Sequence, residues 1–149
     1  MSALARFRSF SGPDRLLLLE ALVHVATARA ALLIFPFRWL VTWLGWKVDD
    51  SAVPTPAGHA PPQARRIASA VELVARRTPW ESACLARATA AKLMLRKRGL
   101  ASQLCLGTRI DSNGKLLAHA WLRCGDDVLV GAAEYRSFTF LSGFADRSP

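Results

Sequence analysis

The sequence predicts an α+β fold in which helices come first and a cysteine-bearing helix then packs on an antiparallel sheet. Leucine-rich helical patterns fill the first third of the chain, a helix with clear stop signals begins near Cys84, and short apolar segments with turn signals follow it. We expect an N-terminal helical lobe over residues 1–48, a proline-rich linker or loop over 49–62 and a core over 63–149.

The N-terminal lobe has the signals of two helices. Ser11 with Asp14 three residues on is typical of a helix start, and Pro36 should end that helix near Ile34. A shorter helix with Trp39 and its neighbours would follow. These apolar faces could cover the core, form a docking surface for partner proteins, or lie on a membrane surface.

A membrane span is not expected in this lobe, because charged and polar residues interrupt its longest apolar stretch at Glu20, His24, Arg29 and Arg38. Glu20 also breaks the only possible apolar core of a secretory signal. After the lobe, prolines and little hydrophobic content over 49–62 indicate a linker or surface loop, in which we expect His59 to be solvated. A helix from about Gln63 to Arg77 should come next.

The helix that starts near Cys84 should end at Arg98, because cations and Gly99 close the pattern. With Ser82 as N-cap, Cys84 would lie in the first turn, where free backbone N–H groups and the helix dipole stabilise a thiolate. A competing start at the capping box Thr78 to Glu81 would place Cys84 deeper in the helix. The local sequence leaves both starts open.

His119 lies in the middle of the apolar segment Leu116 to Arg123, which follows the turn sequence Asp111 to Gly114 and predicts the second strand of a hairpin. By the two-residue period of a strand, His119 and Trp121 share one face, and the flanking alanines share the other. A helix N-terminus packed on this sheet could bring the Cys84 sulfur and the imidazole together. Trp121 is expected to pack in the core, with a place in a substrate pocket as the alternative.

An imidazole base needs an orienting group, and Glu134 is the acid that fits the strand geometry. If the chain reverses at Asp126 and Asp127, these acids lie about 23 Å from His119 at ~3.3 Å per residue, and Glu134 falls almost opposite the histidine. A strand bulge or a backbone carbonyl could do the same work.

The other two cysteines are weaker candidates. Cys105 should lie opposite Trp121 and diagonal to His119, which makes it a rival nucleophile without a helix N-terminus. Cys124 is expected to be structural, and no short Cys-x-x-Cys pair supports a zinc site, so we expect no metal and no cofactor. Three cysteines without paired spacing point to a reducing, cytoplasmic location.

The chain carries a formal charge of +9 over 149 residues, and its basic residues cluster as Arg65-Arg66, Arg76-Arg77 and Arg96-Lys97-Arg98. Two of these clusters fall at expected helix C-termini, where cations are ordinary. No nucleic-acid motif and no basic face interleaved with aromatic residues accompanies them. An acidic peptide or an acidic protein surface is therefore a better partner for this charge than nucleic acid.

The catalytic part of the chain resembles the transglutaminase-like leader peptidases of lasso-peptide biosynthesis. The matching segments are Cys84-Leu85, Leu95 to Leu100, Leu106 to Arg109, and Ala118-His119-Ala120-Trp121-Leu122 with Gly125 after it. The resemblance runs from about Trp80 to Leu141, and the leucine-rich start Leu16 to Trp46 also fits. It implies a papain/transglutaminase-like core with Cys84 as nucleophile and His119 as base.

The third catalytic position departs from that family, whose aspartate follows the histidine by about a dozen residues. This chain has Val130-Gly131-Ala132-Ala133 there, so Glu134 would be a substitute. The resemblance further implies a lasso precursor peptide as substrate, a separate leader-binding protein and an ATP-dependent lasso cyclase as partners. A transglutaminase-like acyltransferase and a non-catalytic scaffold are the alternatives.

Overall fold

The computed structural model describes residues 2–48, 58–78 and 83–146. The helices are α1 (Ala3–Arg8), α2 (Gly12–Ile34), α3 (Phe37–Leu44), α4 (Pro62–Ala75) and α5 (Cys84–Lys97), with a 3-10 turn η1 at Tyr135–Ser137. The strands are β1 (Trp46–Val48), β2 (Gln103–Ile110), β3 (Leu116–Cys124), β4 (Asp127–Val130) and β5 (Thr139–Ala145). Helices precede an antiparallel sheet, so the α+β prediction is confirmed.

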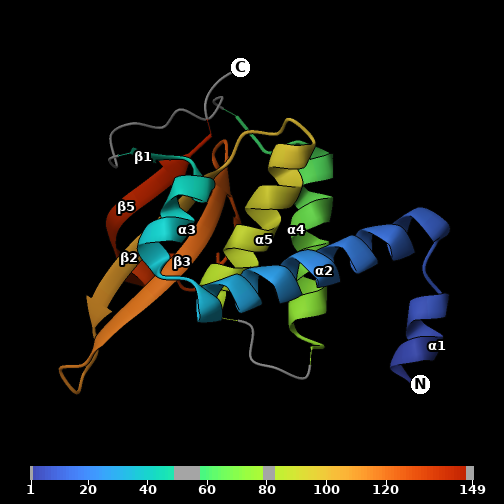
Figure 1. Ribbon diagram of the computed structural model, residues 1–149, viewed down its shortest axis with the longest axis horizontal. Coiled ribbons are helices and arrows are strands. Elements are labelled where there is room, and N and C mark those ends of the chain that lie inside the picture. The colour runs from blue at the N-terminus through green and yellow to red at the C-terminus, as the bar shows by residue number, and fades with distance from the viewer. Residues whose placement is uncertain (1, 49–57, 79–82, 147–149) are drawn as a thin grey trace.

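The sheet has the strand order β1-β5-β2-β3-β4, and every neighbouring pair is antiparallel. The hairpin of β2 and β3 forms its centre and projects beyond the helices (Figure 1). Its turn is closed by Asp111, whose side chain accepts hydrogen bonds from the N–H groups of Asn113 and Lys115 at 2.9 Å. Cys105 pairs with Trp121, as the sequence predicts.

Helices α4 and α5 lie side by side next to the sheet, and α2 crosses them on the side away from it (Figure 1). One buried cluster joins α2, through Ala21, Val25 and Ala28, to α4, α5 and the sheet residues Ala120 and Leu122. The apolar residues that join these layers span the expected lobe and the expected core. The division at residues 49–62 stays a prediction.

A buried lysine fastens α5 to the end of the sheet. Lys92 is 0% exposed, and its ammonium donates to the Ser102 carbonyl at 2.8 Å and lies 3.2 Å from the Asp146 carboxylate. Arg96 binds the other oxygen of Asp146 at 2.8 Å. Burial lowers the pKa of Lys92 from 10.5 to about 8, because desolvation outweighs the attraction of Asp146.

The expected start and end of α2 are confirmed, and α1 is a helix that the sequence analysis did not expect. Ser11 caps α2 and accepts a hydrogen bond from the Asp14 N–H, and the chain leaves the helix at Phe35, just before Pro36. Glu20 on α2 binds Arg98 after α5 with an N–O distance of 2.6 Å, and this hydrogen bond lowers the pKa of Glu20 to about 2. The Ser11 cap therefore begins α2, and the ion pair of Glu20 ties the helix to the end of α5.

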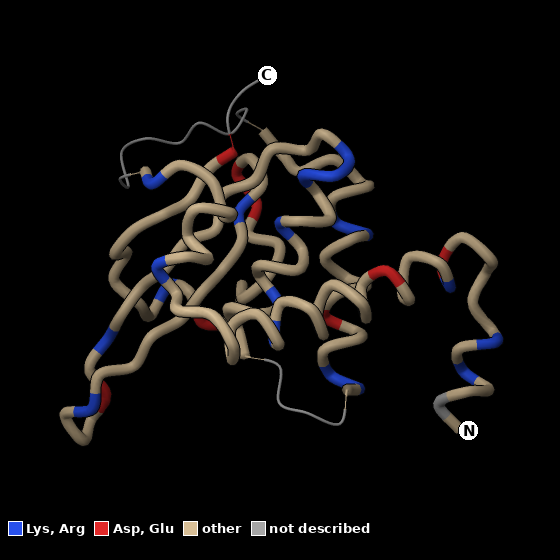
Figure 2. Tube along the Cα trace, in the orientation of Figure 1, with Lys and Arg blue, Asp and Glu red and all other residues tan. Residues whose placement is uncertain are grey.

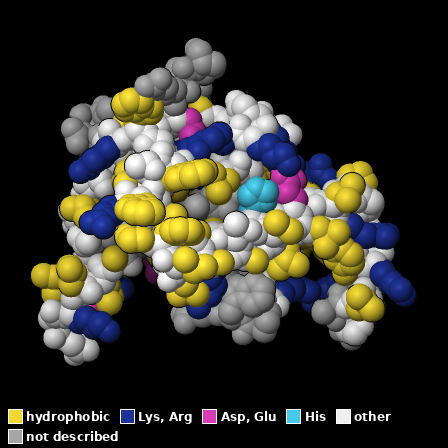
Figure 3. Space-filling view, viewed as in Figure 1, with side chains coloured by type: hydrophobic (Ala, Val, Ile, Leu, Met, Phe, Trp, Pro, Cys, Tyr) yellow, Lys and Arg dark blue, Asp and Glu magenta, His cyan; other side chains and the backbone are white. Residues whose placement is uncertain are grey.

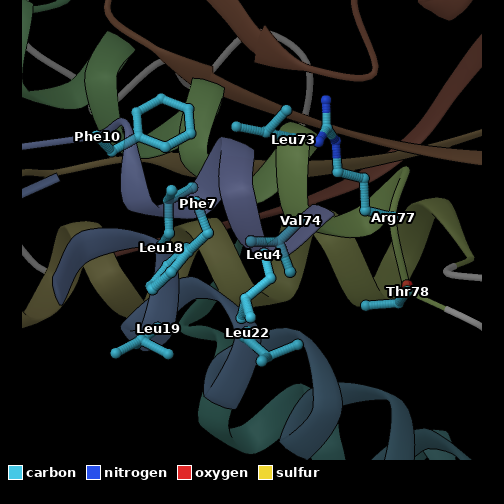
Figure 4. A pocket seen from close by; sticks show the side chains of 10 residues that line it. All are labelled: Leu4, Phe7, Phe10, Leu18, Leu19, Leu22, Leu73, Val74, Arg77 and Thr78. Atoms are coloured by element: carbon cyan, nitrogen blue, oxygen red, sulfur yellow. The ribbon is translucent and has the colours of Figure 1, made fainter. Parts of the chain in front are cut away.

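Apolar side chains from the segment of α1, from α2 and from α4 line a common hollow. Leu4, Phe7 and Phe10 face Leu18 and Leu22 of α2 and Leu73 and Val74 of α4, around a hollow of about 310 Å³ (Figure 4). The hollow is open to solvent and is lined almost entirely by hydrocarbon.

The segment before α4 is tied to the turn between β3 and β4. Asp127 accepts hydrogen bonds from the Ala60 N–H at 2.8 Å and from Arg65 at 2.8 Å, and its pKa falls to about 2, with the backbone hydrogen bond from Ala60 as the largest cause. His59 is also 3.2 Å from Asp127, although 83% of its side chain is exposed. The end of the expected linker is thus part of the fold, and residues 49–57 lie outside the described residues.

Helix α2 is long and apolar enough to cross a membrane, with a mean hydropathy of 1.8 over its most apolar window. Only 17% of that window is buried. A single such helix near the N-terminus is weak evidence for a span, because the core helix of a soluble protein or a signal sequence passes the same test. The expected cytoplasmic location stays a prediction.

Candidate active site

Cys84 is the first residue of α5, and the residue before it, Ala83, is the N-cap with an extended backbone and no side-chain cap. The intrahelical ladder starts with the Arg87 N–H, which bonds the Ala83 carbonyl at 3.2 Å. The N–H groups of the first three helical residues therefore precede the ladder and surround the Cys84 thiol with positive potential. The predicted helix start at Cys84 is confirmed, and the alternative start at the capping box Thr78 to Glu81, which would place Cys84 deeper in the helix, is wrong. Ser82 lies outside the described residues.

His119 lies in the middle of β3, as expected, and is 8% exposed. Its ring stacks on Phe138 at 5.0 Å and on Trp121 at 6.0 Å between centroids. Ala120 and Leu122, on the alternate face of the strand, belong to the cluster that packs against α5. The helix thus packs on the alanine face, and His119 lies on the opposite face of β3, where it lines a cleft together with Cys84.

The edge of β3 is open because β4 is short. β4 pairs with β3 only from Leu122 to Cys124, so the β3 residues before Leu122 extend beyond it. A cleft of about 580 Å³ forms there between α4, α5 and the β3 edge. Cys84, Ala118 and His119 all line it. The thiol and the imidazole come from different elements and share one solvent-accessible cavity.

The hydrogen bond of the His119 ring specifies its tautomer. Among the described residues, the ring bonds the Gly131 carbonyl, with Nε2 and O 3.1 Å apart. A carbonyl oxygen can only accept, so this contact requires a proton on Nε2, and in the neutral imidazole Nδ1 is then the nitrogen with the lone pair. Nδ1 is therefore the atom of His119 that can take a proton from a thiol.

Gly131 is suited to this contact by having no side chain. Its φ is +75°, and a Cβ there would lie 3.0 Å from His119 Nε2 and 2.8 Å from the Ala120 carbonyl. Gly131 follows His119 by 12 residues, which is where the resembling family has its aspartate. The sequence allowed a backbone carbonyl as an alternative to Glu134, without indicating which residue would supply it.

Glu134 is not opposite His119 in a strand, and that part of the expectation is wrong. β4 ends at Val130, and the left-handed backbone at Gly131 then turns the chain into η1, with Glu134 as its N-cap. Glu134 is exposed and lines the same cleft as Cys84 and His119. Its role as the orienting acid stays a prediction.

Three further charged residues line the cleft: Glu72 of α4, Arg76 directly after α4 and Arg87 of α5. Of these, only Arg76 was named from the sequence, as part of a basic cluster. Arg87 binds Glu72 at 3.1 Å and so joins the two helices beside Cys84. Its Nε atom is buried and has no hydrogen-bond partner among the residues that the structure describes. The spacing of Cys84 and Arg87, three residues apart on one helix, could have revealed this neighbour from the sequence.

The remaining cysteines lie in packed surroundings. Cys105 is 1% exposed, and Cys124 is 6% exposed with its thiol 3.4 Å from the Ala101 carbonyl. Burial raises the pKa of the Cys124 thiol, and Asp127 adds to the effect. Trp121 is 4% exposed and lies against Gly107, where a Cβ would be 2.8 Å from the indole. Neither cysteine nor Trp121 is among the residues that line the cleft.

Comparison with models of known protein families identifies the family of this chain. Residues 31–143 match the transglutaminase-like superfamily, from the end of α2 to β5. The chain belongs to the transglutaminase-like superfamily. This superfamily includes cysteine proteases and acyltransferases. No match was found among curated proteins or among solved structures. Within the described residues, no group of three or more His, Cys, Asp or Glu side chains is placed to hold a metal ion.

Proposed function

We propose that this transglutaminase-like protein is a cysteine peptidase that removes the leader from a ribosomally made lasso-type precursor. The observation that carries the proposal is the shared cleft, in which Cys84 begins a helix and His119 has its Nε2 proton bound by the Gly131 carbonyl. A thiol at a helix N-terminus beside an unprotonated Nδ1 is the arrangement that nucleophilic cysteine chemistry requires.

In the proposed reaction, His119 Nδ1 takes the proton of the Cys84 thiol, and the thiolate attacks the carbonyl carbon of the scissile amide. The free N–H groups at the start of α5 hold the oxyanion of the tetrahedral intermediate. The imidazolium then protonates the leaving amine, which departs as the N-terminus of the core peptide. Water, deprotonated by the same imidazole, hydrolyses the thioester and releases the leader with a carboxylate.

The choice of a leader peptide as substrate is supported by the sequence resemblance around Cys84 and His119. Both residues lie within the segment that matches the transglutaminase-like superfamily. The helices before the core offer leucine-rich packing surfaces, so recognition of the leader is assigned to a separate leader-binding protein. Cyclisation of the released amine is assigned to an ATP-dependent lasso cyclase. The sequence has no phosphate-binding loop, so ATP would influence cleavage only through that partner.

The test is mass spectrometry of a lasso-type precursor incubated with this protein and a cognate leader-binding protein. Leader release by the native chain, lost in Cys84→Ala and in His119→Ala but retained in Cys105→Ala, is the expected result. Cys105→Ala is the matched control, because it removes a buried thiol from the same sheet. Release that survives Cys84→Ala would overturn the mechanism.

Two other functions give different products in the same assay. A transglutaminase-like acyltransferase would join the leader acyl group to an added primary amine, and the product mass would show the amine in place of water. A non-catalytic scaffold would release nothing by itself, and Cys84→Ala would leave the output of the complete maturation system unchanged. The open cleft beside Cys84 favours a reaction over a purely structural role.

A further inference from the structure

The corner between α2 and α3 exposes more hydrocarbon than a packed domain needs. All seven residues from 33 to 39 are exposed. We call the following residues the apolar corner, with their exposed fractions: Leu33 (74%), Ile34 (71%), Phe35 (47%), Phe37 (40%), Trp39 (57%) and Trp43 (74%). Figure 3 shows hydrophobic side chains gathered over α3 and along α2 on this face. Contiguous exposed apolar surface of this kind marks an interaction site.

A groove lies behind the apolar corner. It has a volume of about 410 Å³ and runs between α2, α3 and α5, with Ala31, Leu32 and Leu93 among its lining residues. Thr27 and Thr89 are its hydroxyl-bearing residues, and no charged residue lines it. A narrow, hydrocarbon-lined groove next to exposed aromatic rings suits a flexible alkyl chain.

The segment of the chain that carries the corner has charges of one sign only. Between Glu20 and Asp49 the chain has three cations, Arg29, Arg38 and Lys47, and no acidic residue (Figure 2). Arg38 projects from the corner itself and is exposed. Tryptophans next to cations are favoured where a membrane's headgroups meet its acyl chains, and anionic headgroups attract the cations.

We propose that the apolar corner docks this protein on the surface of an anionic phospholipid membrane, without crossing it. Leu33, Ile34 and the aromatic side chains enter the boundary between headgroups and acyl chains, and the cations contact the anionic headgroups. Ala21, Val25 and Ala28 keep α2 packed on the domain, so the helix lies along the membrane instead of spanning it. Leu85, the residue after Cys84, lines the groove, so docking brings the start of α5 close to the membrane.

The experiment is co-sedimentation of the full chain with vesicles of neutral phosphatidylcholine and of phosphatidylcholine mixed equally with phosphatidylglycerol. We expect binding to the anionic vesicles, with a blue shift of tryptophan emission, and at least tenfold weaker binding to neutral ones. The double variant Leu33→Ser/Ile34→Ser should weaken binding to anionic vesicles at least tenfold. Both side chains are more than two-thirds exposed, so the fold is retained, which circular dichroism checks.

Matched controls lie on the projecting hairpin. Ile110 and Leu116 are 71% and 67% exposed, and Ile110→Ser/Leu116→Ser should bind as the native chain does. Arg38→Gln should weaken binding to anionic vesicles, and Lys115→Gln, on the same hairpin, should not. Cys84→Ala should bind fully, so membrane docking and the proposed peptidase activity can fail independently.

Three results would overturn the proposal. The first is no binding to either vesicle; the second is equal loss of binding in the corner and hairpin variants. The third is a dimer in solution that Leu33→Ser/Ile34→Ser dissociates while vesicles capture nothing, because the corner would then bind a second copy of the chain.

Discussion

Replacing Lys92 by methionine should change how the stability of the protein depends on pH. Methionine has a similar length and no charge, and Arg96 remains on Asp146 at 2.8 Å, so the carboxylate is not left without a cation. The lysine is 0% exposed, and its pKa is about 8 in the fold against 10.5 for an ordinary lysine. At about 1.4 kcal/mol per pKa unit, this difference corresponds to about 3 kcal/mol of free energy of unfolding.

The direction of this pH dependence follows from which state, folded or unfolded, holds the lysine proton at each pH. Below pH 8 the lysine is protonated in both states, and the fold carries the full cost of burying an ammonium. Between pH 8 and 10.5 the unfolded chain keeps the proton that the folded chain has released, so the native protein gains stability as pH rises. The methionine variant has no such group. The unfolding free energy of the native protein should therefore rise by about 2 kcal/mol relative to the variant between pH 8 and 9.5.

Denaturant unfolding followed by circular dichroism at several pH values measures this difference. Lys97→Met is the control on the same helix, because 67% of the Lys97 side chain is exposed and solvent hydrates its ammonium. Relative to Lys97→Met, the unfolding free energy of the native protein should show no comparable rise between pH 8 and 9.5. If the difference in unfolding free energy between the native chain and Lys92→Met stayed constant from pH 7 to 10, burial would not lower the pKa of Lys92, and the prediction would be refuted.

Three other perturbations test different contacts. Gly131→Ala should abolish turnover, because the added Cβ would displace His119. Gly114→Ala should lower stability without affecting turnover, because Gly114 has the similar φ of +78° but open space around it. Enzyme kinetics and melting curves of both variants test these two expectations. Glu20→Gln should lower the free energy of unfolding by about 1–2 kcal/mol at pH 7, because the Glu20 side chain is only 19% exposed where it binds Arg98. This loss should shrink as pH falls from 4.5 to about 2, where the native carboxylate becomes protonated. Urea melts across this pH range measure the loss, and a loss independent of pH would contradict the prediction. Asp127→Ala should free the segment before α4, and limited proteolysis with mass spectrometry should then find faster cleavage near residues 58–61; unchanged cleavage would show that the Asp127 contacts do not hold this segment.

Several elements were predictable because local chemistry decides them. Ser11 caps α2, Pro36 follows its end, and Asp111 closes the hairpin turn, each through contacts within a few residues along the chain. Pairing the two strands around the turn at Asn113 also placed Cys105 opposite Trp121. These signals specify a backbone conformation or a register without reference to the rest of the molecule.

The geometry behind the Glu134 prediction failed because it assumed that β4 continues opposite His119. In the structure β4 ends at Val130, and the chain turns at Gly131 into η1. A glycine permits a left-handed backbone but does not require it, so the turn depends on the close approach of Gly131 to His119 and the Ala120 carbonyl. The sequence also did not predict that Glu72 and Arg87 line the cleft, because their positions depend on how α4 packs on α5.

The sequence by itself determined the α+β class, the helix that contains Cys84 and its end near Arg98, and the strand position and face of His119; the structure chose between the two candidate starts of that helix. Those features follow from hydrophobic periods, caps and turn residues, which act over a few residues. Only the tertiary structure decided that α5 packs on the alanine face, that a short β4 opens a cleft joining Cys84 to His119, and that the Gly131 carbonyl holds the imidazole. Those depend on contacts between segments far apart in the chain, and no local pattern encodes the distance between them.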